Sequence, residues 1–119
     1  MLQNETLNPN RICRSWHSNG ELAREKVIVN GVPQGFYREW DSNGRLSLVE
    51  YYTDGELNGY RRIWDENGHL QKEEVYSHGH FHGLQRQWND KGILVSAVSY
   101  EGGQLNGNAR YWLDRKSVV

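Results

Sequence analysis

Apolar and polar residues repeat with a period of 24 residues along the chain. Each unit contains two short stretches in which aromatic or branched residues alternate with polar ones. In the second unit, one stretch ends at the turn signal Ser42-Asn43-Gly44 and the next at Asp54-Gly55. Such alternation predicts half-buried strands, and Asn-Gly or Asp-Gly between them predicts hairpins. We therefore expect an all-β fold, an elongated single-layer antiparallel β-meander of tandem hairpins. About nine or ten strands would stack over roughly 45 Å at ~4.8 Å per strand.

Residue types occupy fixed columns within this period. A tryptophan occurs once per unit, an arginine stands two residues before it, and glycines recur at three fixed positions. The tryptophans are Trp16, Trp40, Trp64, Trp88 and Trp112, and the arginines are Arg14, Arg38, Arg62, Arg86 and Arg110. The turn glycines include Gly44, Gly68, Gly59 and Gly83. Glycines this frequent argue against helices and act as turn residues, so the columns have a structural explanation before any functional one.

Strand alternation assigns the side chains to two faces. Arg38 and Trp40 point to one side, while Tyr37 points to the other. If each hairpin kept a symmetric register, the returning strand would place Leu46 and Tyr52 on the tryptophan side. The opposite side carries no repeated residue type, so we expect it to face water.

The same register predicts ion pairs between neighbouring strands, which contribute roughly 0.2–1 kcal/mol each. Two glutamates are paired with an arginine of the next unit: Glu50 with Arg62, and Glu74 with Arg86. At the two ends this pattern fails, because Lys26 would oppose Arg38 and Val98 would oppose Arg110. We therefore expect Arg38 and Arg110 to lack an acidic partner.

The motif G-x-x-R-x-W, followed by Y-x-[DN]-G-x-x-x-G, resembles the MORN-repeat family in its variant form. The best copies are GFYREWDSNGRL and GYRRIWDENGHL, and the resemblance covers about residues 11–115. It implies a twisted single-layer β-meander that serves as a protein-interaction or membrane-adjacent scaffold. In bacterial relatives it is often labelled an antitoxin component, and such repeats are also abundant in some large viruses of amoebae. We divide the chain into an N-terminal extension or cap at residues 1–10 and a repeat domain at 11–119. The repeat domain has four full periods, a terminal half repeat and a C-terminal cap.

Composition narrows the classes of function. The 119 residues are 36% hydrophobic and carry a formal net charge of -1, so we expect no specific nucleic-acid partner. Cys13 is the only cysteine, which fits a reducing compartment. No apolar stretch is long enough for a transmembrane helix, and the first ten residues lack the features of a signal peptide. We expect a soluble intracellular protein, cytoplasmic, or in the host-cell cytoplasm or virion if it is viral.

Aromatic residues beside arginines are the candidate binding groups. Stacked aromatics suit nucleobases or quaternary ammonium groups, and guanidinium groups suit carboxylates and phosphates. The alternative is structural, because a thin sheet needs its tryptophans as a core and its arginine stems as packing. We favour this structural role for the columns as a whole. The candidate binding residues are Arg38, Arg110, Trp40, Trp64, Trp88 and Tyr37.

The segment SHGHFHG is a candidate metal site. His80 and His82 share a strand face, but zinc needs at least a third protein ligand. His82 also occupies the column of Asn58, and His78 that of Asp54, so each replaces a polar turn residue. We therefore expect no metal and no cofactor. No catalytic motif stands out from the repeat, so we do not expect an enzyme.

These observations predict a non-catalytic repeat scaffold that binds a protein partner and associates with itself as a homo-oligomer. Self-association is expected because a single-layer sheet leaves apolar area that must be shielded. Two alternatives stay open. One is an adaptor that binds an anionic membrane or phosphoinositide surface, and the other is an antitoxin-like regulator of a partner protein.

Overall fold

The computed structural model describes residues 10–113 and 116–117. Strands account for most of these residues and no helix occurs among them, which confirms the predicted all-β class. The strands are β1 (Asn10–Trp16), β2 (Leu22–Val29), β3 (Val32–Trp40), β4 (Leu46–Thr53), β5 (Glu56–Leu57), β6 (Gly59–Trp64), β7 (Leu70–Ser77), β8 (His80–Phe81), β9 (Gly83–Trp88), β10 (Leu94–Glu101), β11 (Gln104–Leu113) and β12 (Lys116–Ser117).

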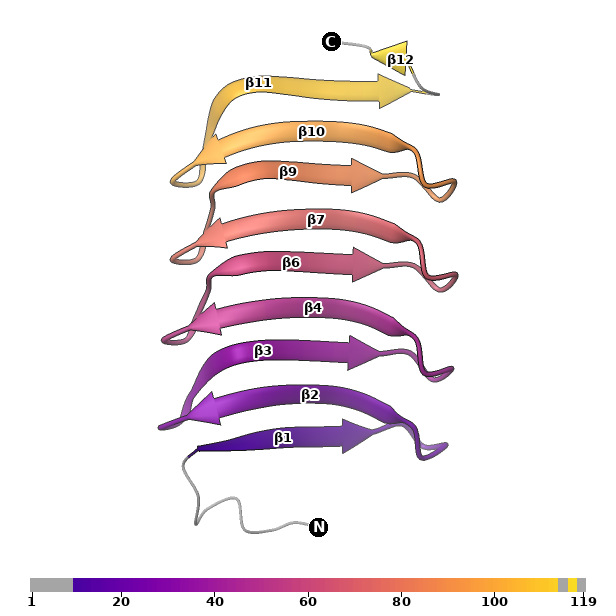
Figure 1. Cartoon of the computed structure of the whole chain (residues 1–119), viewed down its shortest axis with the longest axis vertical. Helices are drawn as coiled ribbons and strands as arrows, with labels where there is room; N and C mark the ends of the chain where they lie inside the picture. The colour runs from indigo at the N-terminus through magenta and orange to yellow at the C-terminus, as the bar shows by residue number, and fades with distance from the viewer. Residues whose placement is uncertain (1–9, 114–115, 118–119) are drawn as a thin grey trace.

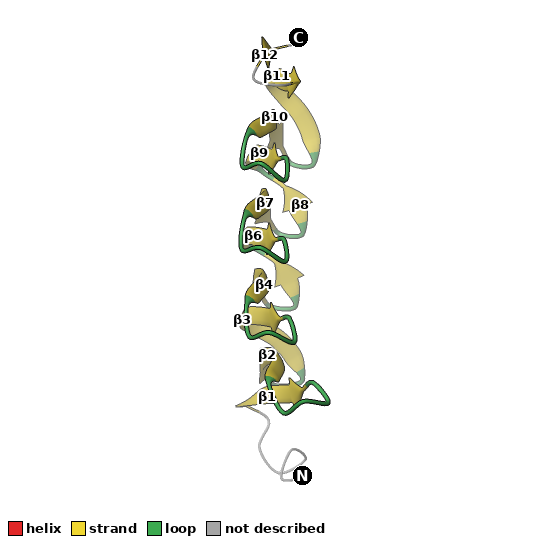
Figure 2. Ribbon diagram, turned by 90° about the vertical axis from the view of Figure 1, so that its right-hand side faces the viewer, coloured by secondary structure: helices red, strands yellow, loops and turns green. Residues whose placement is uncertain are grey.

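The strands form a meander, as predicted. Figure 1 shows the long strands lying side by side in the order β1-β2-β3-β4-β6-β7-β9-β10-β11, followed by the short β12, each antiparallel to the next. The two-residue strands β5 and β8 pair with β4 and β7 at one margin of the sheet. The molecule measures 54 × 34 × 11 Å, and the edge-on view in Figure 2 shows a single stack of strands. The described part of the chain therefore forms one layer, with no second sheet against it.

A tight loop follows the tryptophan of each hairpin. In the second unit the Asp41 N–H donates to the Arg45 carbonyl at 2.8 Å, and the Gly44 N–H donates to the Asp41 carbonyl at 3.0 Å. The Asp41 carboxylate accepts the N–H groups of Asn43 and Arg45 at 2.9 and 3.0 Å. Gly44 has a φ of 85°, a left-handed conformation that side chains disfavour. The prediction of a three-residue loop with a left-handed glycine is confirmed.

The second turn joins consecutive units. Asp54 and Gly55 both have positive φ, at 52° and 85°, as a two-residue type I′ turn requires. The same geometry recurs at Asn30-Gly31 and His78-Gly79. The Gly55 N–H donates to the Pro33 carbonyl of the preceding unit at 2.9 Å. Each such turn is fastened to the unit before it, so the units stack in constant register.

Each hairpin contains a register shift next to its tryptophan. Trp40 lies opposite Leu46, whereas its neighbour Glu39 lies opposite Leu48, so β4 contains one extra residue. A one-residue shift moves every following side chain to the other face of the sheet. Tyr52 consequently lies on the side opposite to the arginines. The predicted placement of Tyr52 on the tryptophan side is wrong for this reason.

Few side chains of the sheet are fully buried. Val49 and Val98 are the buried apolar residues among the described side chains, with 8% and 7% of their surface exposed. Buried polar residues outnumber them: Glu25, Glu50, Gln85 and Ser96. The sheet is therefore held together mainly by its backbone ladder, its turns and its cross-strand polar pairs rather than by an apolar core.

Candidate interaction surface

The sheet presents two unlike faces, which we name by their most regular columns. The arginine face carries Arg14, Arg38, Arg62 and Arg86, and the tyrosine face carries Tyr37, Tyr52, Tyr76 and Tyr100. Residues directly opposite each other in an antiparallel pair share a face. The strand register therefore assigns each remaining side chain to one of the two faces.

Glu25 lies between two arginines of the arginine face. Its carboxylate accepts hydrogen bonds from Arg14 Nε at 2.7 Å and from Arg38 Nη2 at 2.8 Å, and the residue is only 7% exposed. The hydrogen bond from Arg14 lowers the pKa of Glu25, as does the charge of Arg38, although burial acts in the opposite direction. Glu25 is therefore a buried carboxylate that stays ionised because two guanidinium groups hold it.

A second triad repeats this arrangement two units later. Glu73 accepts from Arg62 Nε and from Arg86 Nη1, both at 2.9 Å. The predicted partners of these two arginines were Glu50 and Glu74, and both predictions are wrong. The extra residue in each returning strand moves Glu50 and Glu74 to the tyrosine face and leaves Glu73 opposite Arg62.

Arg38 is not unpaired, so the prediction that it lacks an acidic partner is also wrong. Glu25, rather than Lys26, lies opposite Arg38 and binds it. The guanidinium carbon of Arg38 lies 4.0 Å from the ring centroid of Phe36 and 5.8 Å from that of Trp40. Arg38 is thus held by one ion pair and by stacking on aromatic rings.

Two predicted residues lie near the C-terminal end of the sheet. The backbone of Arg110 lies opposite Ala97, one position from the predicted Val98. The side chains of Arg110 and Trp112 lie outside the described residues. The binding role predicted for Arg110 and the structural role predicted for Trp112 stay predictions.

Val49 occupies the place between two arginines that belongs to glutamate in the triads. It lies opposite Arg38 on one side and opposite Arg62 on the other. One consequence is that Arg38 Nε, a buried donor, has no hydrogen-bond partner. The position nine residues after each tryptophan reads Glu25, Val49, Glu73 and Ala97. This alternation over two units was visible in the sequence, and the predicted ion pairs missed it by one residue.

A row of apolar side chains runs beside the arginines along the sheet. This apolar row consists of Ile12, Val27, Phe36, Tyr51, Tyr60, Val75 and Leu84. Four members are exposed: Ile12 at 46%, Tyr51 at 42%, Tyr60 at 46% and Leu84 at 38%. Arg62 lies over the ring of Tyr60 at 4.3 Å. Among the described residues the row has nothing packed over it, because the sheet has a single layer.

The tryptophans lie at the loop margin of the sheet. Trp40, Trp64 and Trp88 are half-buried, and each lies opposite the leucine of its own hairpin. Trp88 and Leu70 line a shallow hollow between two neighbouring loops. Trp16, at the end of the array, is 60% exposed because it has a neighbouring unit on one side only. This arrangement resembles packing between units more than a continuous aromatic binding surface.

The tyrosine face, which was expected to face water, carries a hydrogen-bonded network that the sequence did not predict. Arg61 donates from Nε to Glu50 at 2.5 Å and from Nη1 to Glu74 at 2.8 Å. The hydroxyl of Tyr52 donates to Glu50 at 2.9 Å, and that of Tyr76 donates to Glu74 at 3.1 Å. Every charged group of this cluster has a partner, which favours a structural role for the cluster.

Three phenols of this face are held in their protonated form. Burial raises the pKa of Tyr37, Tyr52 and Tyr76 to about 12. Hydrogen bonds to carboxylates add to the effect, including the one that Tyr37 donates to Glu39. These tyrosines therefore act as hydrogen-bond donors near neutral pH and offer no base or nucleophile.

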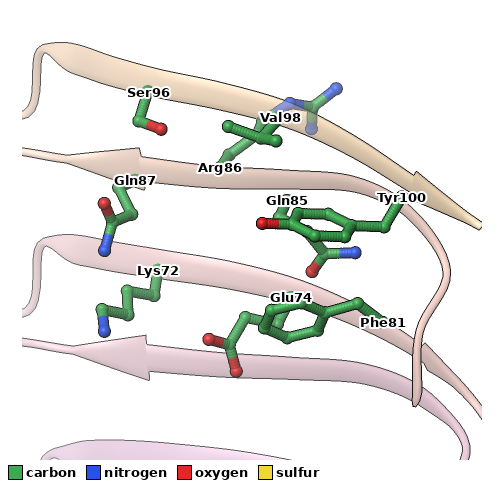
Figure 3. Close-up of a pocket in the computed structure, with 9 residues that line it drawn as sticks. All are labelled: Lys72, Glu74, Phe81, Gln85, Arg86, Gln87, Ser96, Val98 and Tyr100. Atoms are coloured by element: carbon green, nitrogen blue, oxygen red, sulfur yellow. The ribbon is translucent and has the colours of Figure 1, made fainter. Parts of the chain in front are cut away.

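Two hollows lie on the tyrosine face. The first has a volume of about 320 Å³. Figure 3 shows the rings of Phe81 and Tyr100 together in this hollow, beside Glu74 and Gln85. The amide of Gln85 is already engaged, because it accepts from the Val75 N–H at 2.8 Å and donates to the Val75 carbonyl at 3.0 Å. Lys72 and Glu74 also line the hollow, but the Glu74 carboxylate is already bound by Arg61 and Tyr76. These groups favour a structural role for the hollow.

The second hollow, of about 270 Å³, lies at the N-terminal end of the same face. Cys13, Ser15, Arg24, Lys26 and Tyr37 contribute to its walls. Tyr37, a predicted binding residue, faces this hollow, and its hydroxyl is occupied by Glu39. Among the residues that line this hollow, no carboxylate lies beside the thiol and hydroxyl groups to act as their general base.

The histidines occupy turn positions. His78 has a φ of 51°, and its N–H donates to Asn58 Oδ1 at 3.1 Å, as a polar turn residue does. His80 belongs to β8, and His82 donates its N–H to the Val75 carbonyl. Within residues 10–113 and 116–117, no three histidine, cysteine or acidic side chains are grouped to hold a metal ion. In the same residues no helix is long and apolar enough to cross a membrane.

Comparison with known proteins identifies the repeat. A family model described as the MORN repeat variant matches residues 57–78. A search of curated proteins and a search of solved structures found no match. The matched segment contains β6, β7 and the loop between them, and the same turns and columns recur in the other units. MORN repeats are non-enzymatic repeats that generally mediate contacts with proteins or membranes. The match supports assigning residues 57–78 to the MORN repeat variant.

Proposed function

We propose that this chain is a non-catalytic scaffold that binds other proteins through its arginine face. The observation that carries the proposal is the exposure of four apolar-row side chains, at 38–46% of their surface. Large apolar side chains gathered in one row on a single-layer sheet are typical of a contact surface. Aromatic residues and arginines are also the residue types enriched at protein interfaces.

Self-association is part of this proposal. The apolar row follows the repeat, so a second copy presents the same side chains at the same spacing, and two rows can face each other along their length. A flat layer only 11 Å thick has no other way within the described residues to cover this row. A homo-oligomer in the reducing interior of the cell is consistent with the single Cys13.

Sedimentation equilibrium tests the self-association. We expect the wild-type mass to rise with concentration toward that of a dimer, and a double variant, Tyr51→Ser with Tyr60→Ser, to remain a monomer. The matched control is Leu105→Ser, because Leu105 is 60% exposed and lies outside the apolar row. A wild-type protein that stays monomeric over the whole concentration range rules out self-association. A double variant that still dimerises places the contact elsewhere.

Binding to an anionic membrane is the second candidate, favoured by the four partly exposed arginines of the arginine face. Glu25 and Glu73 neutralise half of that charge, which weakens attraction to an anionic surface. Sedimentation with vesicles of phosphatidylserine and phosphatidylcholine at low salt separates the two functions. The protein scaffold predicts no pelleting, whereas the membrane adaptor predicts pelleting that high salt reverses.

A further inference from the structure

On the arginine face, one position between two arginines is occupied by an apolar residue. The equivalent position in two other units is occupied by a glutamate. In the first and third units, the strand between two successive arginines supplies Glu25 or Glu73, and both arginines bind it. In the second unit the equivalent residue is Val49, which lies opposite Arg38 and Arg62. Two guanidinium groups thus flank an apolar residue on the strand between them.

The donors at this position follow the pattern of the triads. In each triad the first arginine binds the carboxylate through Nε, as Arg14 and Arg62 do. Arg38 is the equivalent residue for the Val49 position, and its Nε has no partner. Arg38 uses only Nη2, toward Glu25, and Arg62 uses only Nε. Nη1 of Arg38 and both Nη groups of Arg62 make no bond to the described residues.

The two guanidinium groups are also held in place before any partner arrives. Arg38 stacks on Phe36 at 4.0 Å and Arg62 stacks on Tyr60 at 4.3 Å. Their side chains are 38% and 34% exposed, so a partner can reach their outer guanidinium atoms, although Arg38 Nε itself is buried. Restricting long side chains in advance reduces the entropy lost on binding. Tyr51 is exposed next to this site and adds an apolar contact area.

We propose that Arg38 and Arg62, above Val49, bind a carboxylate side chain from an acidic segment of a partner protein. This carboxylate takes the place that Glu25 and Glu73 fill in the triads, and an apolar neighbour in the same segment packs on Tyr51 and Tyr60. The inference rests on the proposed protein-binding function and names its chemistry. A carboxylate is the expected group because the chain itself places one between such arginines twice.

Fluorescence anisotropy with short labelled peptides tests this proposal. The probe is a seven-residue peptide with a central glutamate flanked by leucines. Its glutamine twin and a phosphoserine version provide the comparison. On the wild-type protein we expect the glutamate peptide to bind about tenfold tighter than the glutamine peptide, as one charge-assisted interaction provides.

Two variants locate the site. Val49→Glu supplies an internal carboxylate, so it should compete with the peptide and weaken binding about tenfold or more while the sheet stays folded. Its matched control is Thr53→Glu, at an exposed position of the same strand. Arg38→Gln should weaken binding as well, and its control is Arg24→Gln, an arginine of the tyrosine face that has no ion pair among the described residues. Circular dichroism verifies folding, and if Val49→Glu does not fold, Arg38→Gln alone decides.

The outcomes separate this proposal from the broader one. Equal binding of the glutamate and glutamine peptides overturns it, as does a folded Val49→Glu protein that binds like wild type. Preference for the phosphoserine peptide, or binding to phosphatidylserine vesicles alone, assigns the site to phosphate instead. If the protein dimerises through the apolar row but discriminates no peptide, the proposed function stands and this inference fails.

Discussion

Replacing Glu25 by glutamine isolates the contribution of one ion-pair triad. The substitution keeps the shape of the side chain but removes its charge and turns one acceptor oxygen into a donor group. Both oxygens of Glu25 are in use, one by Arg14 at 2.7 Å and the other by Arg38 at 2.8 Å. In the Glu25→Gln variant, one guanidinium therefore faces an NH₂ group and loses its hydrogen bond.

The size of the effect follows from these two bonds. One charge-assisted hydrogen bond, worth about 1.5–3 kcal/mol, is lost, and the other becomes a weaker bond to a neutral acceptor at a cost of about 1 kcal/mol. Arg14 and Arg38 are 45% and 38% exposed, so water replaces part of what is lost. We expect the free energy of unfolding to fall by about 2 kcal/mol, and Tm to fall by about 6–10 °C for a chain of this size.

Chemical denaturation followed by circular dichroism measures this change, and its pH dependence identifies the cause. The pKa of Glu25 is lowered in the folded state from its ordinary value of 4.5. A lowered folded-state pKa contributes stability above the unfolded-state value, and this stability is lost as the pH falls through the folded-state value. The difference between wild type and Glu25→Gln should therefore be complete at pH 7 and should shrink below about pH 4.5.

The control is Glu21→Gln, which makes the same chemical change in an exposed loop, where the carboxylate has no ion pair among the described residues. We expect this variant to unfold within about 0.5 kcal/mol of wild type. Equal unfolding free energies for the two variants at pH 7 would show that the Glu25 triad does not stabilise the sheet. A difference that persists undiminished at pH 3 would show that shape, and not charge, is responsible.

Three further predictions test other parts of the fold. Three tyrosines have a pKa of about 12: Tyr37, Tyr52 and Tyr76. Their absorbance at alkaline pH should titrate near 12 in the folded protein. A raised folded-state pKa stabilises the folded protein at pH values below the unfolded-state pKa, so this stability should disappear as the pH rises through 12. Normal titration near 10 in a sheet that is still folded contradicts the network on the tyrosine face. Gln85→Ala leaves the Val75 N–H without its acceptor, so we expect the free energy of unfolding to fall by about 1–3 kcal/mol and hydrogen exchange at the Val75 amide to become faster. Unchanged exchange at this amide argues against the structural role of Gln85. Gly68→Ala places a side chain at a φ of 85° with no atom within 4 Å. We therefore expect backbone strain alone to lower the free energy of unfolding, measured by denaturation, by about 1–2 kcal/mol. A neutral effect contradicts the assigned turn.

The errors in the predicted ion pairs have a single physical origin. The sequence predicted that each returning strand runs without interruption from its leucine, which placed Glu50 opposite Arg62. The structure has an extra residue between Leu46 and Leu48, and this shift moves Glu50 to the other face. A bulge of this kind depends on how the loop closes and how the strands twist, and no residue type in the column marks it.

The candidate site was predictable only in part, for the same reason. Arg38 was one of two arginines expected to have no acidic partner, yet it binds Glu25 and still has a donor without a bond. The important residue beside it, Val49, is an ordinary strand residue in the sequence. Its meaning appears only when the register places it between Arg38 and Arg62.

The sequence by itself determined the repeat, the turns and the class of fold. The turns require glycine at a left-handed position and favour Asn or Asp before it, and both requirements are local. Because these turn signals recur every 24 residues, an array of hairpins is the fold that agrees with all of them. Which residues meet across the strands, and which face they share, depends on the three-dimensional register of the sheet. Side chains alternate with a period of two, so a single extra residue per hairpin reverses the faces without altering any local pattern.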